Sequence, residues 1–236
     1  MPVKLFIPEL GNLFIDDRDR CPGDSYTMGP IINPNDIQYF TFHHSVTAQT
    51  AKNDGDWKKE VDVIGNLHIP RFGGIGYRFI IASSGHVLYV GDLSRGGAAV
   101  ADKNNIMFSA CLVGDFTKEL PTASQIHSAH LLAKYFLDNL SAYPQLDSWD
   151  DIKGHKNFNP TTCPSPNWEG VSDSLRNRIV GDIFQGYPSP SPVIAPPSPP
   201  PQPPVSDPLI VQVHDIIWGK GYTWAKLNKI KLLLPK

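Results

Sequence analysis

Two residues with metal-binding side chains, His155 and Cys163, stand eight positions apart in a segment that its prolines mark as a loop. Imidazole nitrogen and thiolate sulfur are ligands that zinc commonly takes in proteins. A catalytic zinc ion has three protein ligands and leaves a fourth position open to water. The sequence therefore predicts a third ligand elsewhere in the chain.

That third ligand is expected from two adjacent histidines, His43 and His44, which end a strand-like run over residues 37–42. Successive strand residues face opposite sides of a sheet, so only one of the two can reach a given metal. His44 shares its face with two phenylalanines of the run, which indicates the core side and leaves His43 for the metal. The predicted Zn²⁺ ligands are His43, His155 and Cys163.

Five motifs follow one another along the chain with a recognisable order and spacing. They are Phe42-His-His-Ser-Val-Thr47, Gly74-Ile-Gly-Tyr-Arg-Phe-Ile-Ile81, Gly85-His-Val-Leu-Tyr-Val-Gly91, Cys111-Leu-Val-Gly114 and residues 155–164. Together, over residues 36–184, they resemble the zinc amidases of the phage-lysozyme and peptidoglycan-recognition type. In that family the first histidine of the pair, the histidine of the late loop and its cysteine bind zinc. These correspond to the three residues reached above.

The resemblance also implies two catalytic side chains. A tyrosine of the second motif lies beside the metal in the family. Tyr77 holds that position here, so its phenol is expected to orient the attacking water or to stabilise the oxyanion. Family members often have a lysine two residues before the cysteine ligand, whereas this chain has Thr161, as some amidase-active recognition proteins do. Ala99 replaces a frequent histidine, and Met107-Phe-Ser109 replaces Ser-Ile-Gly, which changes the expected substrate contacts.

The activity implied by the resemblance is that of an N-acetylmuramoyl-L-alanine amidase. Such an enzyme hydrolyses the amide between N-acetylmuramic acid and L-alanine, so peptidoglycan is the expected partner and bacterial wall lysis, as by a phage endolysin, the expected outcome. One alternative is a peptidoglycan-binding protein without catalysis, but binding-only relatives usually lack the cysteine that Cys163 supplies. Another is a structural zinc in an adaptor, although a set of three ligands suits catalysis better.

Apolar patterns predict the strands that position these residues. The first strand ends at His43. Residues 77–82 and 86–90 flank a turn at Ser83-Ser-Gly85 and are expected to pair as a β-hairpin, and residues 106–113 indicate another buried strand.

Helical periodicity appears in three further segments. Asp56 is expected to cap a helix whose inner positions are Trp57, Val61, Ile64 and His68. Thr122 and Gln125 form a capping box before a second stripe, made of Ile126, Ala129, Ala133, Phe136 and Leu140. A last helix is expected from Trp168, Val171, Leu175, Ile179 and Ile183. This alternation predicts an α/β fold, a mixed central β-sheet flanked by helices, and the resemblance implies the same.

The chain of 236 residues divides by composition into four parts. Residues 1–35 are expected to be an N-terminal extension that wraps the domain, and residues 36–186 the zinc amidase domain. Eleven prolines between positions 188 and 208 indicate a semi-rigid linker over residues 187–208. Residues 209–236 form a short basic and aromatic tail, interpreted as a wall-binding or docking segment.

The distribution of charge and the N-terminal sequence bear on partners and location. A formal net charge of −2 argues against general nucleic-acid binding, whereas the tail has five lysines and one aspartate, which suits anionic polymers or a membrane surface as well as a solvated end. The first ten residues lack the pattern of a secretory signal. We therefore expect synthesis in a host cytoplasm and action on the wall after release.

Cys111 is expected to be buried and reduced, with pairing to Cys21 as the alternative.

Overall fold

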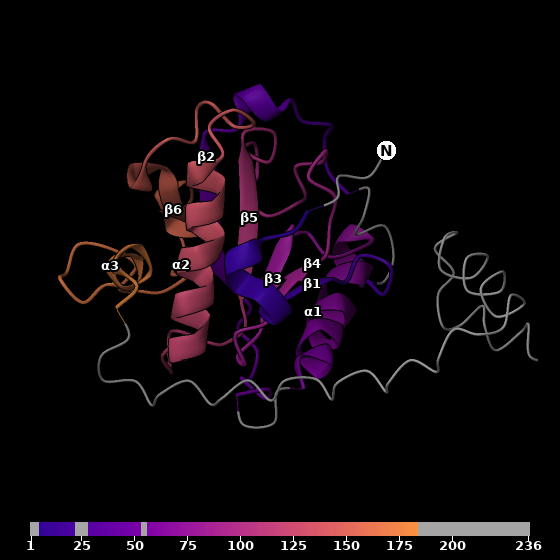
Figure 1. Cartoon of the computed structure of the whole chain (residues 1–236). Coiled ribbons are helices and arrows are strands. Elements are labelled where there is room, and N and C mark those ends of the chain that lie inside the picture. The colour runs from indigo at the N-terminus through magenta and orange to yellow at the C-terminus, as the bar shows by residue number, and fades with distance from the viewer. Residues whose placement is uncertain (1–4, 22–27, 53–55, 184–236) are drawn as a thin grey trace, which may run out of the picture. The chain divides into compact units, whose positions relative to one another are not determined.

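The computed structural model describes residues 5–21, 28–52 and 56–183. They form one sheet with helices on both faces (Figure 1). The strands are β1 (Phe14–Asp16), β2 (Tyr39–His44), β3 (Phe79–Ile81), β4 (Val87–Tyr89), β5 (Met107–Leu112) and β6 (Ile152–Gly154). The α-helices are α1 (Trp57–Phe72), α2 (Ala123–Asp138) and α3 (Leu175–Gly181). Short 3-10 helices lie at η1 (Pro8–Leu13), η2 (Pro34–Asp36), η3 (Trp149–Asp151) and η4 (His155–Asn157).

The six strands are arranged in the order β1-β4-β3-β5-β2-β6. β3 and β4 pair in antiparallel fashion as the predicted hairpin, and the other neighbouring pairs are parallel. The expectation of a mixed α/β sheet is therefore confirmed. Because β2, β5 and β3 run in the same direction, residues at their ends gather at common edges of the sheet.

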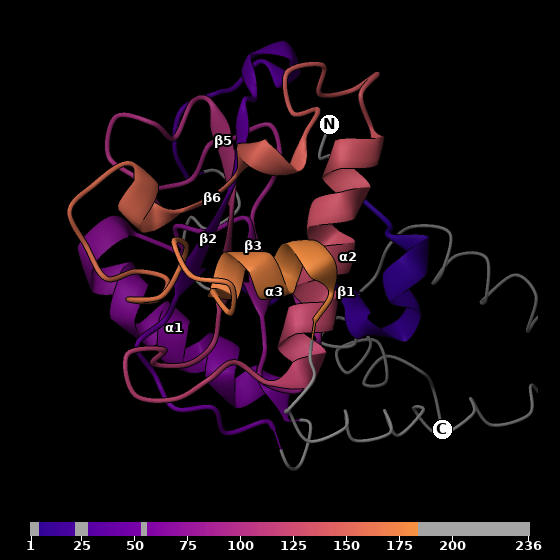
Figure 2. The same cartoon turned by 90° about the vertical axis from the view of Figure 1, so that its left-hand side faces the viewer.

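The two long helices cover opposite faces of the sheet, as Figure 2 shows. On one face α2 packs on a cluster rich in phenylalanine, which includes Phe40, Phe42, Phe79, Phe108 and Phe136. On the other face α1 packs on a smaller cluster, which includes Val61, Ile64, Ile80, Leu88 and Cys111. Strand alternation explains the division: even-numbered residues of β2 and β5 meet α2, and odd-numbered residues face the side of α1.

Helix α2 begins at the predicted capping box. Thr122 accepts a hydrogen bond from the backbone of Gln125 at 3.1 Å, and Gln125 accepts one from the backbone of Thr122 at 3.0 Å. The expected stripe is buried as far as Phe136, but Leu140 was wrongly included. The helix ends at Asp138, and Leu140 lies beyond it with 49% of its surface exposed.

The last helix is shorter than its apolar spacing predicts. Gly170 adopts a φ of +90°, and Ser174 caps the helix by accepting a hydrogen bond from Asn177 N at 3.2 Å, so α3 starts only at Leu175. Trp168 and Val171 therefore precede the helix. Trp168 is nevertheless fully buried, whereas Val171 is exposed.

The N-terminal segment contributes to the sheet itself. β1 pairs with β4 in parallel at one edge, and Ile7 belongs to the core on the α2 face. The predicted linker and tail, residues 187–208 and 209–236, lie outside the described residues. Within the described ranges, no helix is long and apolar enough to span a lipid bilayer.

Candidate metal centre

His43 occupies the end of β2 and faces the α1 side of the sheet. Its neighbour His44 points to the opposite face, where its Nδ1 accepts a hydrogen bond from Phe116 N at 3.1 Å. The assignment of the two histidines to opposite faces is confirmed. His43 is nevertheless buried, with 1% of its surface exposed. Burial and the neighbouring His155 lower the pKa of His43 well below its ordinary value, so the imidazole is neutral, as a metal ligand must be.

His155 reaches the same place from β6. This strand lies beside β2 in parallel, with Gly154 opposite Phe42, and His155 is the next residue along the chain. Parallel pairing therefore places both histidines at the same end of adjacent strands. Their ring centroids are 4.8 Å apart.

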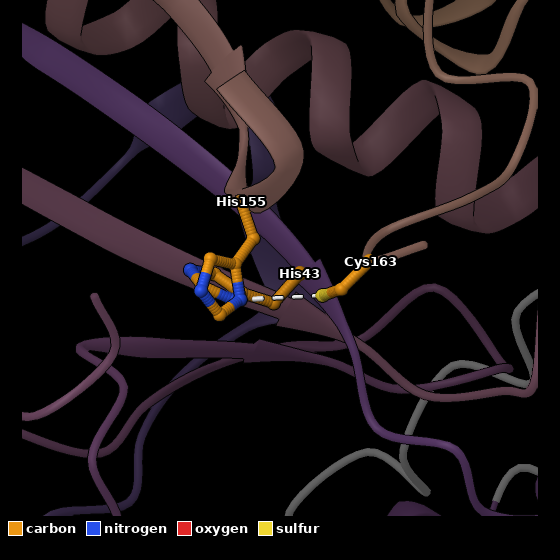
Figure 3. A group of neighbouring side chains, drawn as sticks. All are labelled: His43, His155 and Cys163. Carbon is orange, nitrogen blue, oxygen red and sulfur yellow. Dashed lines mark hydrogen bonds between the residues drawn. The ribbon is translucent and has the colours of Figure 1, made fainter. Parts of the chain in front are cut away.

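Cys163 returns to the site at the end of the following loop. Its carbonyl accepts a hydrogen bond from Lys156 N at 2.9 Å, and its own N–H donates to Thr161 Oγ1 at 3.2 Å. Figure 3 shows the cysteine sulfur directed toward the histidine rings. The three predicted ligands thus converge from two segments, one that ends β2 and one that follows β6.

The geometry of these three side chains fits a tetrahedral zinc ion. One donor atom from each residue lies within 4.8 Å of the others, and Nδ1 of His43 is 3.7 Å from Sγ of Cys163. Ordinary zinc–nitrogen and zinc–sulfur bonds at a tetrahedral angle place the two donors about 3.6 Å apart. Two imidazoles and one thiol are also the donor types that zinc takes.

A second set of contacts fixes the ligand loop to the core. The side-chain oxygen of Asn157 accepts hydrogen bonds from Gly154 N at 2.7 Å and from Trp168 Nε1 at 2.9 Å. Trp168 is fully buried and packs against Phe42, whose ring centroid lies 6.3 Å away. Asn157 therefore links the residue before His155 to the buried segment after Cys163.

Tyr77 lies beside His43, one of the three predicted ligands. Its ring centroid is 5.1 Å from that of His43 and 5.1 Å from that of His68. His68 lies on the inner side of α1, and its Nδ1 accepts a hydrogen bond from Gly76 N at 3.3 Å. Burial, with Cys111 and Cys163 nearby, raises the pKa of the Tyr77 phenol well above its ordinary value, so it keeps its proton at neutral pH.

Thr161 lies two residues before Cys163 and interacts with the backbone of that ligand. Ala99 is part of a turn in which its N–H donates to Asn104 Oδ1 at 2.8 Å. Cys111 is fully buried and free, and Cys21 is also free, so the structure does not pair them.

Asn157 and Asn159 also lie at the site, although the sequence pattern does not indicate them. Asn159 lies 3.4 Å from His155, measured between Nδ2 and Nε2. Their positions two and four residues after a candidate ligand were the available signal, but spacing alone does not show which loop amides turn toward the ring.

This chain is similar in sequence to a family model and to a named protein. The sequence model of a family described as N-acetylmuramoyl-L-alanine amidase matches residues 33–166. Peptidoglycan-recognition protein 2 of Holotrichia diomphalia is 26% identical over 141 residues, which cover 59% of this chain and 70% of that protein.

Two solved structures illustrate the likeness of the fold. The bumblebee PGRP-SA structure has a TM-score of 0.52 and 22% identity, covering 64% of this chain and 88% of its own. Wild-type Drosophila PGRP-LB has a TM-score of 0.50 and 21% identity, covering 64% and 87%. Since the family model spans more than half of the sequence, the chain belongs to the N-acetylmuramoyl-L-alanine amidase family.

Proposed function

We propose that this protein is a zinc-dependent amidase that hydrolyses the bond between N-acetylmuramic acid and L-alanine in peptidoglycan. The observation that carries the proposal is the convergence of His43, His155 and Cys163, with donor atoms within 4.8 Å of one another. Three protein ligands of these types are the arrangement of a catalytic zinc site. Family membership supports the choice of substrate.

A zinc ion held by these residues would activate water and polarise the scissile carbonyl. The side chains around it have separate tasks. The neutral His43 is buried and packs against the rings of Tyr77 and His155. Because the Tyr77 phenol keeps its proton, it can donate a hydrogen bond to the oxygen on which negative charge develops.

Thr161 is proposed to act where many relatives use lysine. Its Oγ1 accepts the hydrogen bond of Cys163 N, which fixes the backbone of the cysteine ligand. The hydroxyl itself remains a donor, and we propose that it assists proton transfer to the leaving amine.

The biological setting that we propose is that of a phage endolysin, made in the host cytoplasm and acting on the wall after release. The support is compositional: a proline-rich segment, residues 187–208, joins the amidase domain to a basic tail, residues 209–236. Such a tail suits an anionic wall polymer or membrane surface.

A second candidate function is recognition of peptidoglycan without hydrolysis. The observation that favours it is the likeness to a protein named for recognition. The presence of Cys163 favours hydrolysis, since the third ligand of the zinc site is in place.

The test combines metal analysis with wall lysis. The purified full chain should bind about one zinc ion and should clear a suspension of purified peptidoglycan. Substitution of His43, His155 or Cys163 by alanine should abolish both the tight binding and the clearing. Clearing that persists in all three variants would refute the amidase assignment. Binding of the chain to peptidoglycan without clearing would favour recognition.

A further inference from the structure

The two histidines of the metal centre differ in how their second ring nitrogen is held. His43 directs Nδ1 toward the sulfur of Cys163, at 3.7 Å. Its Nε2 is buried and has no hydrogen-bond partner among the residues that the structure describes. His155 is different, because its Nε2 faces the side-chain amide of Asn159 at 3.4 Å.

A tight turn after β6 brings Asn159 back to the imidazole. The carbonyl of His155 accepts hydrogen bonds from Phe158 N at 3.0 Å and from Asn159 N at 3.2 Å. These two bonds close the chain on itself just after the ligand. This turn therefore holds the Asn159 side chain near the imidazole ring of His155.

A contact at Nε2 determines which nitrogen is available to a metal. An imidazole that binds a metal through one nitrogen carries its proton on the other, and a partner at that second nitrogen fixes both tautomer and ring orientation. With Asn159 at Nε2, the metal-binding atom of His155 is Nδ1. The Asn159 amide would then accept the hydrogen bond of Nε2–H through its oxygen, which a half-turn of the amide exchanges with its nitrogen.

We propose that Asn159 is a positioning residue that holds His155 in the orientation needed to bind the metal through Nδ1. The inference rests on the proposed zinc site and adds a residue to it. Asn159 acts through His155, so its removal should weaken metal binding while the ligands themselves remain. His43 has no such partner among the described residues, and its ring packs against those of Tyr77 and His155.

Zinc affinity of the full chain tests the proposal. Competition with a chromophoric chelator should show that Asn159→Ala binds zinc roughly 10- to 100-fold more weakly than the wild type, the usual effect of losing such a partner. Asn159→Asp should keep the affinity, because a carboxylate oxygen also accepts a hydrogen bond from Nε2–H. The melting temperature of the metal-free protein should be the same in all three. Asn12→Ala, an exposed substitution in η1, is the matched control.

Two results would overturn the inference in distinguishable ways. Equal zinc affinity in Asn159→Ala and the wild type would remove the role of Asn159 and leave the zinc site intact. A wild type that binds no zinc would remove the proposed function as well. If Asn159→Ala does not fold, Asn159→Ser shortens the side chain while keeping a residue that turns accept, and the same loss of affinity is expected from it.

Discussion

The Nδ1 atom of His43 lies 3.7 Å from the Sγ atom of Cys163, although 120 positions separate the two residues in sequence. The sheet accounts for this proximity. His43 is the penultimate residue of β2, the parallel neighbour β6 leads into His155, and the loop that follows returns to the same edge with Cys163. The group formed by His43, His155 and Cys163 is therefore assembled by strand pairing and by one loop.

Replacing Tyr77 by phenylalanine should lower kcat without lowering zinc affinity. The ring would keep its packing against His43 and His68, whereas the donor of the proposed oxyanion contact would be lost. Removal of one such donor typically costs about 10²- to 10³-fold in kcat. Steady-state kinetics on a soluble muramyl peptide, together with zinc titration, measure the two effects. An unchanged kcat would show that the phenol has no catalytic role.

Asn157→Ala should destabilise the protein by about 1–3 kcal/mol, because it leaves the Trp168 indole N–H without its acceptor in a buried place. Glu169 is exposed and accepts the other hydrogen bond of the Asn157 amide at 2.6 Å, so Glu169→Ala leaves the acceptor of Trp168 in place and should cost less. The free energy of unfolding in urea, measured on the metal-free protein, separates the two variants. If they are equally destabilised, the acceptor is not what anchors the ligand loop.

Two apolar residues of the same segment, Phe136 and Leu140, should differ in how much they contribute to stability. Phe136 is fully buried against the other phenylalanines of the α2 face, so Phe136→Ala should cost about 3–5 kcal/mol of stability. Leu140 lies beyond the end of α2 and is half exposed, so Leu140→Ala should change stability by less than about 0.5 kcal/mol. Equal losses in chemical denaturation would contradict the observed end of the helix.

Cys21 should be unreactive toward alkylating reagents in the folded protein. Burial and the nearby Asp17 raise the pKa of its thiol to about 12, so at pH 8 the reactive thiolate is nearly absent. Reactivity should rise only as the pH approaches that value or when the protein unfolds. Mass spectrometry after brief iodoacetamide treatment, with and without urea, gives the extent of labelling. Rapid labelling of Cys21 at pH 8 without urea would contradict the raised pKa of its thiol.

Alternation along a strand was enough to assign His43 and His44 to opposite faces, because the rule depends only on backbone geometry. The capping box at Thr122 was equally predictable, because it involves only residues that are neighbours in the sequence. The burial of His43 could not be predicted in the same way, because it depends on contacts with Tyr77 and His155, which belong to other parts of the chain.

The predicted start of the last helix and the placing of Leu140 in the α2 stripe were wrong for local reasons, which the spacing of apolar residues does not show. α3 is short because Gly170 takes a positive φ and Ser174 starts the helix later. Leu140 fits the helical stripe, yet the chain leaves the helix after Asp138. The contact between Asn159 and His155 depends on the turn that joins them, which the sequence pattern does not indicate.

The most direct measurement is mass spectrometry of purified peptidoglycan digested by the full chain, with and without a chelator and with zinc added back. Free stem peptides that begin at L-alanine are expected, lost on chelation and restored by zinc. Intact glycopeptide under all conditions, with the protein still bound to it, would contradict hydrolysis and establish recognition alone.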